Sequence, residues 1–207
     1  RALQEGMDEP ILHTGIDEYS PHVPVKFTAV TGGDSPTISD YFTIVYDKVP
    51  RRIVEQTTFG EVVYGDGVVV DAPVGPKGIT LLRAMYAGVA AIAAAGVSLV
   101  VDEVLYQPSV LRAAVEELSD SNVLFVGLRL PLQVAEQRER DRGDRGLGAA
   151  RLFYDRVHLH GIYDLELDTS AMSPDEGARA IKNVLERNQQ GTAFQMLAHR
   201  FAQSSDS

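Results

Sequence analysis

Hydrophobic residues recur with two different spacings in the second half of the chain. Val97–Val104 and Asn122–Leu130 are mostly apolar, which is typical of strands buried on both faces of a parallel sheet. The stretches Ile79–Ala95, Pro108–Leu118 and Pro131–Arg142 have the length and the spacing of helices. Strands that alternate with helices predict a doubly wound α/β fold with a parallel sheet.

The same alternation continues on both sides of this region. Pro10–Asp17 is an apolar run that predicts a strand, and residues 146–158 predict a helix before a strand at Tyr163–Asp168. Alternating side chains in that last strand favour a position at the edge of the sheet. Ser173 and Glu176 have the spacing of a capping box, with a proline between them, and predict the start of a further helix.

Residues 18–78 are irregular, and proline and glycine are frequent among them. Two parts favour strands: Tyr41–Tyr46, and Glu61–Val70 as a hairpin around Gly65-Asp66-Gly67. The region is too small and too polar to hold a core of its own. We therefore expect a flap inserted into a single α/β domain that spans residues 1–187. Residues 188–207 are expected to form a polar tail with a short amphipathic piece.

Composition and charge narrow the classes of function. The chain has 207 residues, of which 44% are hydrophobic, enough for one globular domain with a core. Its net charge of −10 argues against a general nucleic-acid or membrane-surface role, because phosphate backbones and anionic lipids attract Lys and Arg. No cysteine is present, which excludes disulfides and thiolate chemistry. We find no signal peptide and no apolar run of membrane-spanning length, and expect a cytoplasmic protein.

Acidic residues lie at the ends of three predicted strands. Asp17, Asp102 with its neighbour Glu103, and Asp168 each end or follow an apolar run. Ligands of open α/β sheets bind at the carboxyl ends of the strands, so these acids are expected to share one edge. The alternative is that each acid caps the helix or turn that follows it.

A cationic segment follows the second buried strand. Arg138 and Arg142 are four residues apart and lie on one helix face, while Arg145 follows in the next turn. Three guanidinium groups at a helix end suit a transferring phosphoryl group, whose charge must be neutralised in the transition state. The alternative is a solvated helix with Glu–Arg pairs, for example between Glu136 and Arg140.

Other candidate motifs are weaker. His158 and His160 have the spacing of a metal pair but lack an evident third ligand nearby. The glycine-rich segments at 32–35 and 75–78 do not match the Gly-x-x-x-x-Gly-Lys-Ser/Thr pattern of a phosphate-binding loop. We interpret both segments as turns.

Four segments give the chain a resemblance to a known family. They are the strand end Gly15-Ile16-Asp17, the acidic strand Val100–Val104, the lid segment Val134–Arg145, and His158 with Tyr163–Thr169. In these segments the chain resembles the chloramphenicol phosphotransferase-like family of P-loop kinases, and the likeness covers most of residues 1–18 and 78–187. The lid segment is the most specific of the four.

The resemblance implies a three-layer P-loop kinase-like fold and an ATP-dependent enzyme that phosphorylates a hydroxyl group of a small molecule. It implies that Asp17 is the catalytic base and that Asp102 helps to hold Mg²⁺, in part through water. Arg138, Arg142 and Arg145 would close over the ATP phosphates as both binding and catalytic groups. The implied cofactors are ATP and Mg²⁺; the implied partner is the small-molecule acceptor, with no nucleic acid and no membrane.

Two departures from the family pattern matter. The flap at 18–78 is longer than in the family type and lies where the acceptor would bind, so we expect an acceptor other than chloramphenicol. The strand and phosphate-binding loop with which the family begins are not among these 207 residues. That strand would lie in the centre of the sheet, between the strands ending at Asp102 and Leu130. We expect it upstream of Arg1, because buried backbone groups without partners cost roughly 1–3 kcal/mol each. The alternative is a degenerate family member that never had this strand and loop.

Two other functions stay open at this point. A non-catalytic nucleotide- or ligand-binding module would keep the fold and the acidic cleft without turnover. A nucleoside monophosphate kinase would share the lid arginines and differ in its acceptor. Neither the acceptor nor the oligomeric state follows from the sequence.

Overall fold

Two pairs of parallel strands form the centre of the structure. The computed structural model describes all 207 residues except 8, 16–27, 58–59, 143–146, 188–189 and 206–207. Strand β1 (Leu12–Gly15) pairs in parallel with β7 (Leu99–Asp102), and β8 (Val126–Arg129) pairs in parallel with β9 (Leu165–Asp168).

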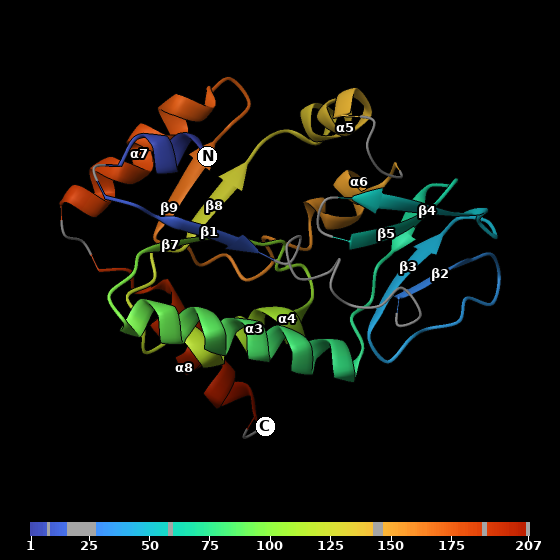
Figure 1. Cartoon of the computed structure of the whole chain (residues 1–207), viewed down its shortest axis with the longest axis horizontal. Helices are drawn as coiled ribbons and strands as arrows, with labels where there is room; N and C mark the ends of the chain where they lie inside the picture. The colour runs from blue at the N-terminus through green and yellow to red at the C-terminus, as the bar shows by residue number, and fades with distance from the viewer. Residues whose placement is uncertain (8, 16–27, 58–59, 143–146, 188–189, 206–207) are drawn as a thin grey trace.

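Helices cover the strand pairs on both sides (Figure 1). On one side lies α7 (Pro174–Glu186), with the short α1 (Ala2–Glu5) in contact with it. On the other side lie α3 (Pro76–Ala94), α4 (Pro108–Leu118) and α8 (Ala193–Ser205). Parallel strands flanked by helices confirm the predicted α/β class and are consistent with a P-loop kinase-like fold.

The two strand pairs are not joined to each other by hydrogen bonds among the described residues. Within the described residues, β7 is hydrogen-bonded to β1 alone, and β8 is hydrogen-bonded to β9 alone. Strands inside a parallel sheet normally pair on both sides. The first strand of the family pattern is expected at this same position, between β7 and β8.

The hydrophobic core lies between α3, α4 and α8. On α3, Leu82, Met85, Tyr86 and Val89 recur at helical spacing and so share one face. They meet core residues of α4 and α8, namely Val110, Leu111, Ala113, Ala114, Val115, Leu118, Phe194 and Leu197. Among the described helices, α3 alone is long and apolar enough to cross a membrane. This is weak evidence for a membrane span, because one face of α3 packs in the core described here.

Helix boundaries follow local signals in the sequence. Helix α4 begins at Pro108 and ends at Leu118, as predicted. The capping box of α7 is confirmed: the Ser173 hydroxyl accepts a hydrogen bond of 3.3 Å from the amide of Glu176, and the Glu176 carboxylate accepts one of 2.8 Å from the amide of Ser173. A cap of this kind contributes about 1 kcal/mol to stability.

The described residues of the flap form two small sheets, which Figure 1 shows at one end of the molecule. The first is three-stranded, with β2 (Thr28–Gly32) parallel to β3 (Phe42–Tyr46) and β3 antiparallel to β6 (Val69–Asp71). The second is an antiparallel hairpin of β4 (Arg52–Thr57) and β5 (Gly60–Gly65). The strand at Tyr41–Tyr46 is therefore confirmed, whereas β2 and β4 were not predicted.

The predicted hairpin at Glu61–Val70 is wrong. Gly65 ends β5 and the chain then crosses to β6 in the other sheet, so residues 61–65 pair with β4 instead. The amide of Gly65 donates a hydrogen bond of 2.7 Å to the Tyr46 hydroxyl, and a Cβ atom at Gly65 would lie 2.5 Å from that of Pro50. Glycine is thus required at position 65 because residues distant in sequence pack closely against it, and not because the chain forms a hairpin turn there.

The segment expected to be a polar tail contains helix α8. Its residues Ala193, Phe194 and Leu197 are almost fully buried against the core. The carboxylate of Asp164 accepts hydrogen bonds from the amides of Thr192 and Ala193, at 2.6 and 3.0 Å, and so caps the helix start. The short amphipathic piece expected near Phe194–Phe201 is therefore part of helix α8, which is longer than expected and packs in the core.

Two helices lie between β8 and β9 in the chain, and Figure 1 shows them beside the flap. They are α5 (Leu132–Arg142), which follows β8, and the short α6 (Ala149–Tyr154). We call α5 and α6, with the residues between them, the lid. Helix α6 is shorter than the predicted 146–158, because residues 155–160 form turns.

Candidate functional site

The carboxyl ends of β1 and β7 lie side by side. Gly15, the last residue of β1, is paired with Asp102, the last residue of β7. A side chain at position 15 would collide with the Asp102 carbonyl oxygen, so the close approach of the two strands requires glycine. Asp102 is exposed to solvent at this end of the strand. Asp17, the predicted base, lies outside the described residues, and its role stays a prediction.

The second strand pair ends with Arg129 opposite Asp168. The Asp168 carboxylate accepts a hydrogen bond of 2.9 Å from the amide of Ser170. Hydrogen bonds from the Ser170 side chain and amide hold the pKa of Asp168 below its ordinary value. Asp168 therefore caps the turn after β9, which is the alternative that the sequence analysis left open for the strand-end acids.

A buried tyrosine lies close to the acidic end of β7. Tyr86 of α3 is 1% exposed, and its hydroxyl has no hydrogen-bond partner within the part of the chain that the structure describes. Burial, and after it the negative charge of Glu103, raise the pKa of Tyr86. Sequence reasoning missed this hydroxyl, because the spacing of Tyr86 on α3 indicates only a core residue.

The lid arginines lie on α5, directly after β8. Arg138 and Arg142 are both exposed. The Arg138 guanidinium donates a hydrogen bond of 2.7 Å to the carbonyl oxygen of Thr169, the residue that follows β9. The lid helix is thus attached to the carboxyl end of the second strand pair. Arg145 lies outside the described residues.

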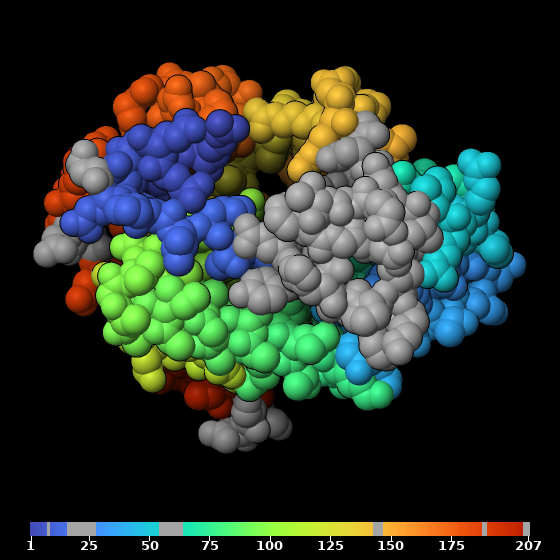
Figure 2. Space-filling view, in the orientation of Figure 1, coloured from blue at the N-terminus to red at the C-terminus, as the bar shows by residue number. Residues whose placement is uncertain are grey.

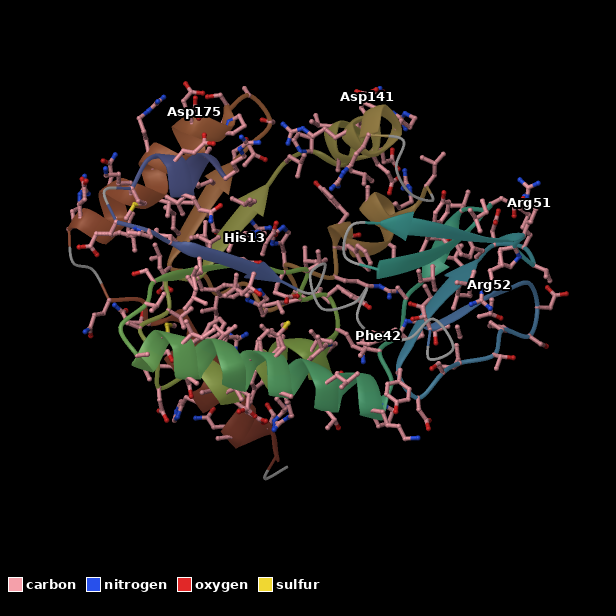
Figure 3. The ribbon with its side chains drawn as sticks, in the orientation of Figure 1. His13, Phe42, Arg51, Arg52, Asp141 and Asp175 are labelled. Carbon is pink, nitrogen blue, oxygen red and sulfur yellow. The ribbon has the colours of Figure 1, made fainter. Side chains whose placement is uncertain are left out.

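The predicted Glu–Arg pairing along α5 differs in detail. Glu136 forms an ion pair of 2.6 Å with Arg151 of α6 and not with Arg140. Arg140 donates a hydrogen bond of 2.8 Å to the Gln137 side chain. Figure 3 shows Asp141 on the outer side of α5, away from His13 on β1. The helix therefore directs Glu136 to α6 while Asp141 and Arg140 remain at the surface.

Polar contacts also join the lid to the flap. The amide of Val69 in β6 donates a hydrogen bond of 2.7 Å to the carbonyl oxygen of Leu147. Arg156, just after α6, forms an ion pair of 2.9 Å with Asp71 at the end of β6. In the space-filling view, lid and flap occupy the same side of the molecule (Figure 2). The lid arginines and the flap therefore belong to neighbouring, connected segments.

The described residues contain no group of three or more His, Asp or Glu side chains that could hold a metal ion. His158 Nδ1 lies 2.6 Å from the Tyr163 hydroxyl, and His160 Nδ1 accepts a hydrogen bond of 3.1 Å from the amide of Ile162. Burial lowers the pKa of both imidazoles. In this structure the two histidines take part in packing and local hydrogen bonding.

The residues present fit Mg²⁺ and ATP in two respects. A single exposed carboxylate, Asp102, suits Mg²⁺, which usually binds one or two carboxylates together with substrate phosphates and water. Arg138 and Arg142 present guanidinium groups at the surface of a helix, and guanidinium groups bind phosphate oxygens well. The assignments of Asp102 and the arginines as ligands stay predictions.

Comparison with known proteins gives one family. A model of the family described as chloramphenicol phosphotransferase-like protein matches residues 1–186. Two proteins from two strains of Mycobacterium tuberculosis, whose names describe them as proposed O-phosphotransferases, are 28% identical to the chain over 120 residues. The matched part is 58% of this chain and 53% of each relative, so the chain spans about half the length of the curated relatives it matches.

Proposed function

Because the chain belongs to the chloramphenicol phosphotransferase-like family, we propose that it is an ATP-dependent phosphotransferase that acts on a hydroxyl group of a small molecule. The family match and the names of the relatives support phosphotransferase activity at the level of the family. The observation that carries the proposal is the position of Arg138. Its exposed guanidinium lies on the lid helix and is held at the carboxyl end of β9 by Thr169.

Each candidate residue has a role that its chemistry suits. ATP would supply the phosphoryl group, and Mg²⁺ would offset its negative charge. Arg138 and Arg142, with Arg145, would stabilise the charge that develops on the phosphoryl oxygens. Asp102 would hold the metal ion, in part through water. Asp17 would accept the proton of the acceptor hydroxyl as its oxygen attacks phosphorus.

We further propose that the phosphate-binding loop comes from a segment outside residues 1–207. The support is the strand pairing: within the described chain, β7 and β8 each have a ladder partner on one side. A parallel strand placed between them would satisfy both edges, and the turn after such a strand is the usual place of a phosphate-binding loop. Assays therefore call for the full-length protein.

The flap is the proposed contact surface for the acceptor. It provides two small sheets next to the lid, and it is connected to the lid through Leu147 and Arg156. We expect this region to be longer than in the family type, and we therefore propose a small hydroxylated acceptor other than chloramphenicol. We propose that the protein is cytoplasmic and that it binds neither nucleic acid nor membranes.

An acceptor screen tests the proposal. The full-length protein is incubated with Mg²⁺, ATP and separate hydroxylated compounds: sugars, nucleosides, amino alcohols and chloramphenicol. ADP release is followed, and ³¹P NMR identifies any phosphate ester; samples without Mg²⁺ serve as the control. We expect one class of compound to yield ADP and phosphate ester in equal amounts. ATP binding without turnover of any compound would contradict the proposal and favour a binding module of the same fold.

A further inference from the structure

Glu139 on the lid helix uses both of its carboxylate oxygens to hold α6. Oε2 accepts a hydrogen bond of 2.9 Å from the amide of Gly148, and Oε1 accepts one of 2.8 Å from the amide of Ala150. The N-cap position of α6 is Gly148, which has no side chain with which to cap the helix. Glu139, nine positions earlier in the chain, therefore caps the N-terminus of α6 in place of an N-cap side chain.

The amides that Glu139 binds lie against the flap. Gly148 has a φ of 103°, and a Cβ atom there would lie 2.6 Å from the carbonyl oxygen of Val69. Its neighbour Leu147 accepts the hydrogen bond from the amide of Val69. The carboxylate of Glu139 thus connects α5, through the start of α6, to strand β6 of the flap.

Polar contacts determine how α5 is oriented, because none of its residues is buried. A helix without a buried apolar face has little hydrophobic packing to fix its rotation about its axis. The Arg138–Thr169 hydrogen bond fixes one side of α5, and the two hydrogen bonds of Glu139 fix another. Adjacent residues on a helix are 100° apart, so the faces of Arg138 and Glu139 are neighbours. A rotation of α5 that released Glu139 would also move the arginines.

We propose that Glu139 is a positioning residue for phosphoryl transfer, an inference that rests on the proposed function. By capping α6 with both oxygens, it holds the lid helix at the rotation in which Arg138 and Arg142 face the phosphates. It also keeps the lid in register with the flap on which the acceptor would bind. Glu139 itself touches neither substrate: its effect on the rate passes through the arginines.

Glu139→Gln in the full-length protein tests this role. Glutamine keeps the size of the side chain and one acceptor oxygen, but its NH₂ group would face one of the two backbone amides. The matched control is Asp141→Asn on the same helix, because the Asp141 carboxylate is exposed and accepts a hydrogen bond from Gln137 in its own helix. It removes the same charge without touching α6, and Figure 3 shows Asp141 on the outer side of α5.

The probe is Mg²⁺ with ATP and the compound of the acceptor screen that gives the highest rate, and the readout is ADP formation well below the unfolding temperature of each variant. We expect kcat of Glu139→Gln to fall on the order of 10- to 100-fold, because small displacements of catalytic groups have effects of this size. The KM for ATP should change less than about threefold, since the lost interaction acts mainly in the transition state. Asp141→Asn should match the unchanged protein.

Two outcomes would overturn the inference, and they differ from failure of the proposed function. A kcat within about twofold of the unchanged protein, even with a lower unfolding temperature, would make Glu139 a purely structural cap. An increase in KM with unchanged kcat would show a contribution to binding alone and would also exclude a positioning role. If the unchanged full-length protein transfers phosphate to none of the compounds in the acceptor screen, the proposed function itself fails, and the inference falls with it.

Discussion

The amide of Val69 donates a hydrogen bond of 2.7 Å to the carbonyl oxygen of Leu147, and this bond joins the flap to the lid. Phosphoryl transfer requires the acceptor and the phosphate-binding groups to meet in line, with water kept out. A lid that is joined to the proposed acceptor side by backbone hydrogen bonding and by the Arg156–Asp71 ion pair would meet this requirement as one unit.

Gly148→Ala should break this junction. The residue has a φ of 103°, and its new Cβ atom would lie 2.6 Å from the Val69 carbonyl oxygen. The strained backbone alone costs about 1–3 kcal/mol of unfolding free energy, and the collision should separate α6 from β6. Urea unfolding measures the loss of stability, and hydrogen exchange at the Val69 amide measures the separation.

Gly161→Ala is the control for Gly148→Ala. Gly161 also has a positive φ, of 63°, but a Cβ atom there meets open space. It should lower the unfolding free energy by about 1–2 kcal/mol through backbone strain while the Val69 amide stays as protected as before. Equal protection of that amide in the two variants would contradict the contact that we assign to Gly148.

Arg138→Ala should reduce the rate of phosphoryl transfer far more than it reduces stability. Removing one positively charged stabiliser of the transition state costs on the order of 10²- to 10³-fold in kcat. Exposed polar contacts contribute about 0–1 kcal/mol to stability, so the unfolding midpoint should hardly change. Arg140→Ala is the matched control, because Arg140 is exposed and donates a hydrogen bond to Gln137 in its own helix. Equal rates for the two variants would remove Arg138 from the site.

Local signals in the sequence predicted much of the sheet-and-helix body. Pro108 marks the start of α4, and the Ser173–Glu176 capping box marks the start of α7, because both act within one helical turn. The glycine at 65 was misread for the opposite reason. Its contacts with Tyr46 and Pro50 join distant parts of the chain, and no short window of sequence contains them.

The candidate site shows the same division. The strand-end position of Asp102 and the helix face of Arg138 and Arg142 follow from sequence spacing. The capping contact of Glu139 does not, because it depends on a turn that brings α6 back to α5. Helix α8 was anticipated only as a short amphipathic piece: its burial depends on packing against α4, which local polarity does not reveal.

Stability should decrease as the pH falls through the range in which histidine titrates. Burial lowers the folded-state pKa of His158 and His160 below the ordinary value of 6.5. The unfolded chain then binds more protons, so the stability linked to these residues is fully present above pH 6.5 and is lost as the pH falls towards the folded pKa. Urea midpoints measured from about pH 7.5 to about pH 5.5 should show the decrease. The double variant His158→Gln with His160→Gln should flatten it, and an unchanged slope would contradict the assignment.

Gly88→Ala should stabilise the protein. Gly88 is an exposed residue in the middle of α3, and a Cβ atom there would meet nothing within 4 Å. Alanine loses less backbone entropy than glycine in a helix interior, a difference of about 0.5–1 kcal/mol. Thermal unfolding should show a higher midpoint. A lower midpoint would mean that the outer face of α3 is covered in the natural protein.

Asp17→Asn in the full-length protein is the decisive test of the proposed phosphoryl transfer. Phosphate transfer to the best acceptor of the screen and the Kd for ATP are measured on the same preparation. We expect transfer to be lost while the Kd stays almost unchanged, because in the proposed mechanism Asp17 accepts the acceptor's proton and does not hold the nucleotide. Transfer that persists at the original rate would contradict Asp17 as the base and, with it, the proposed mechanism.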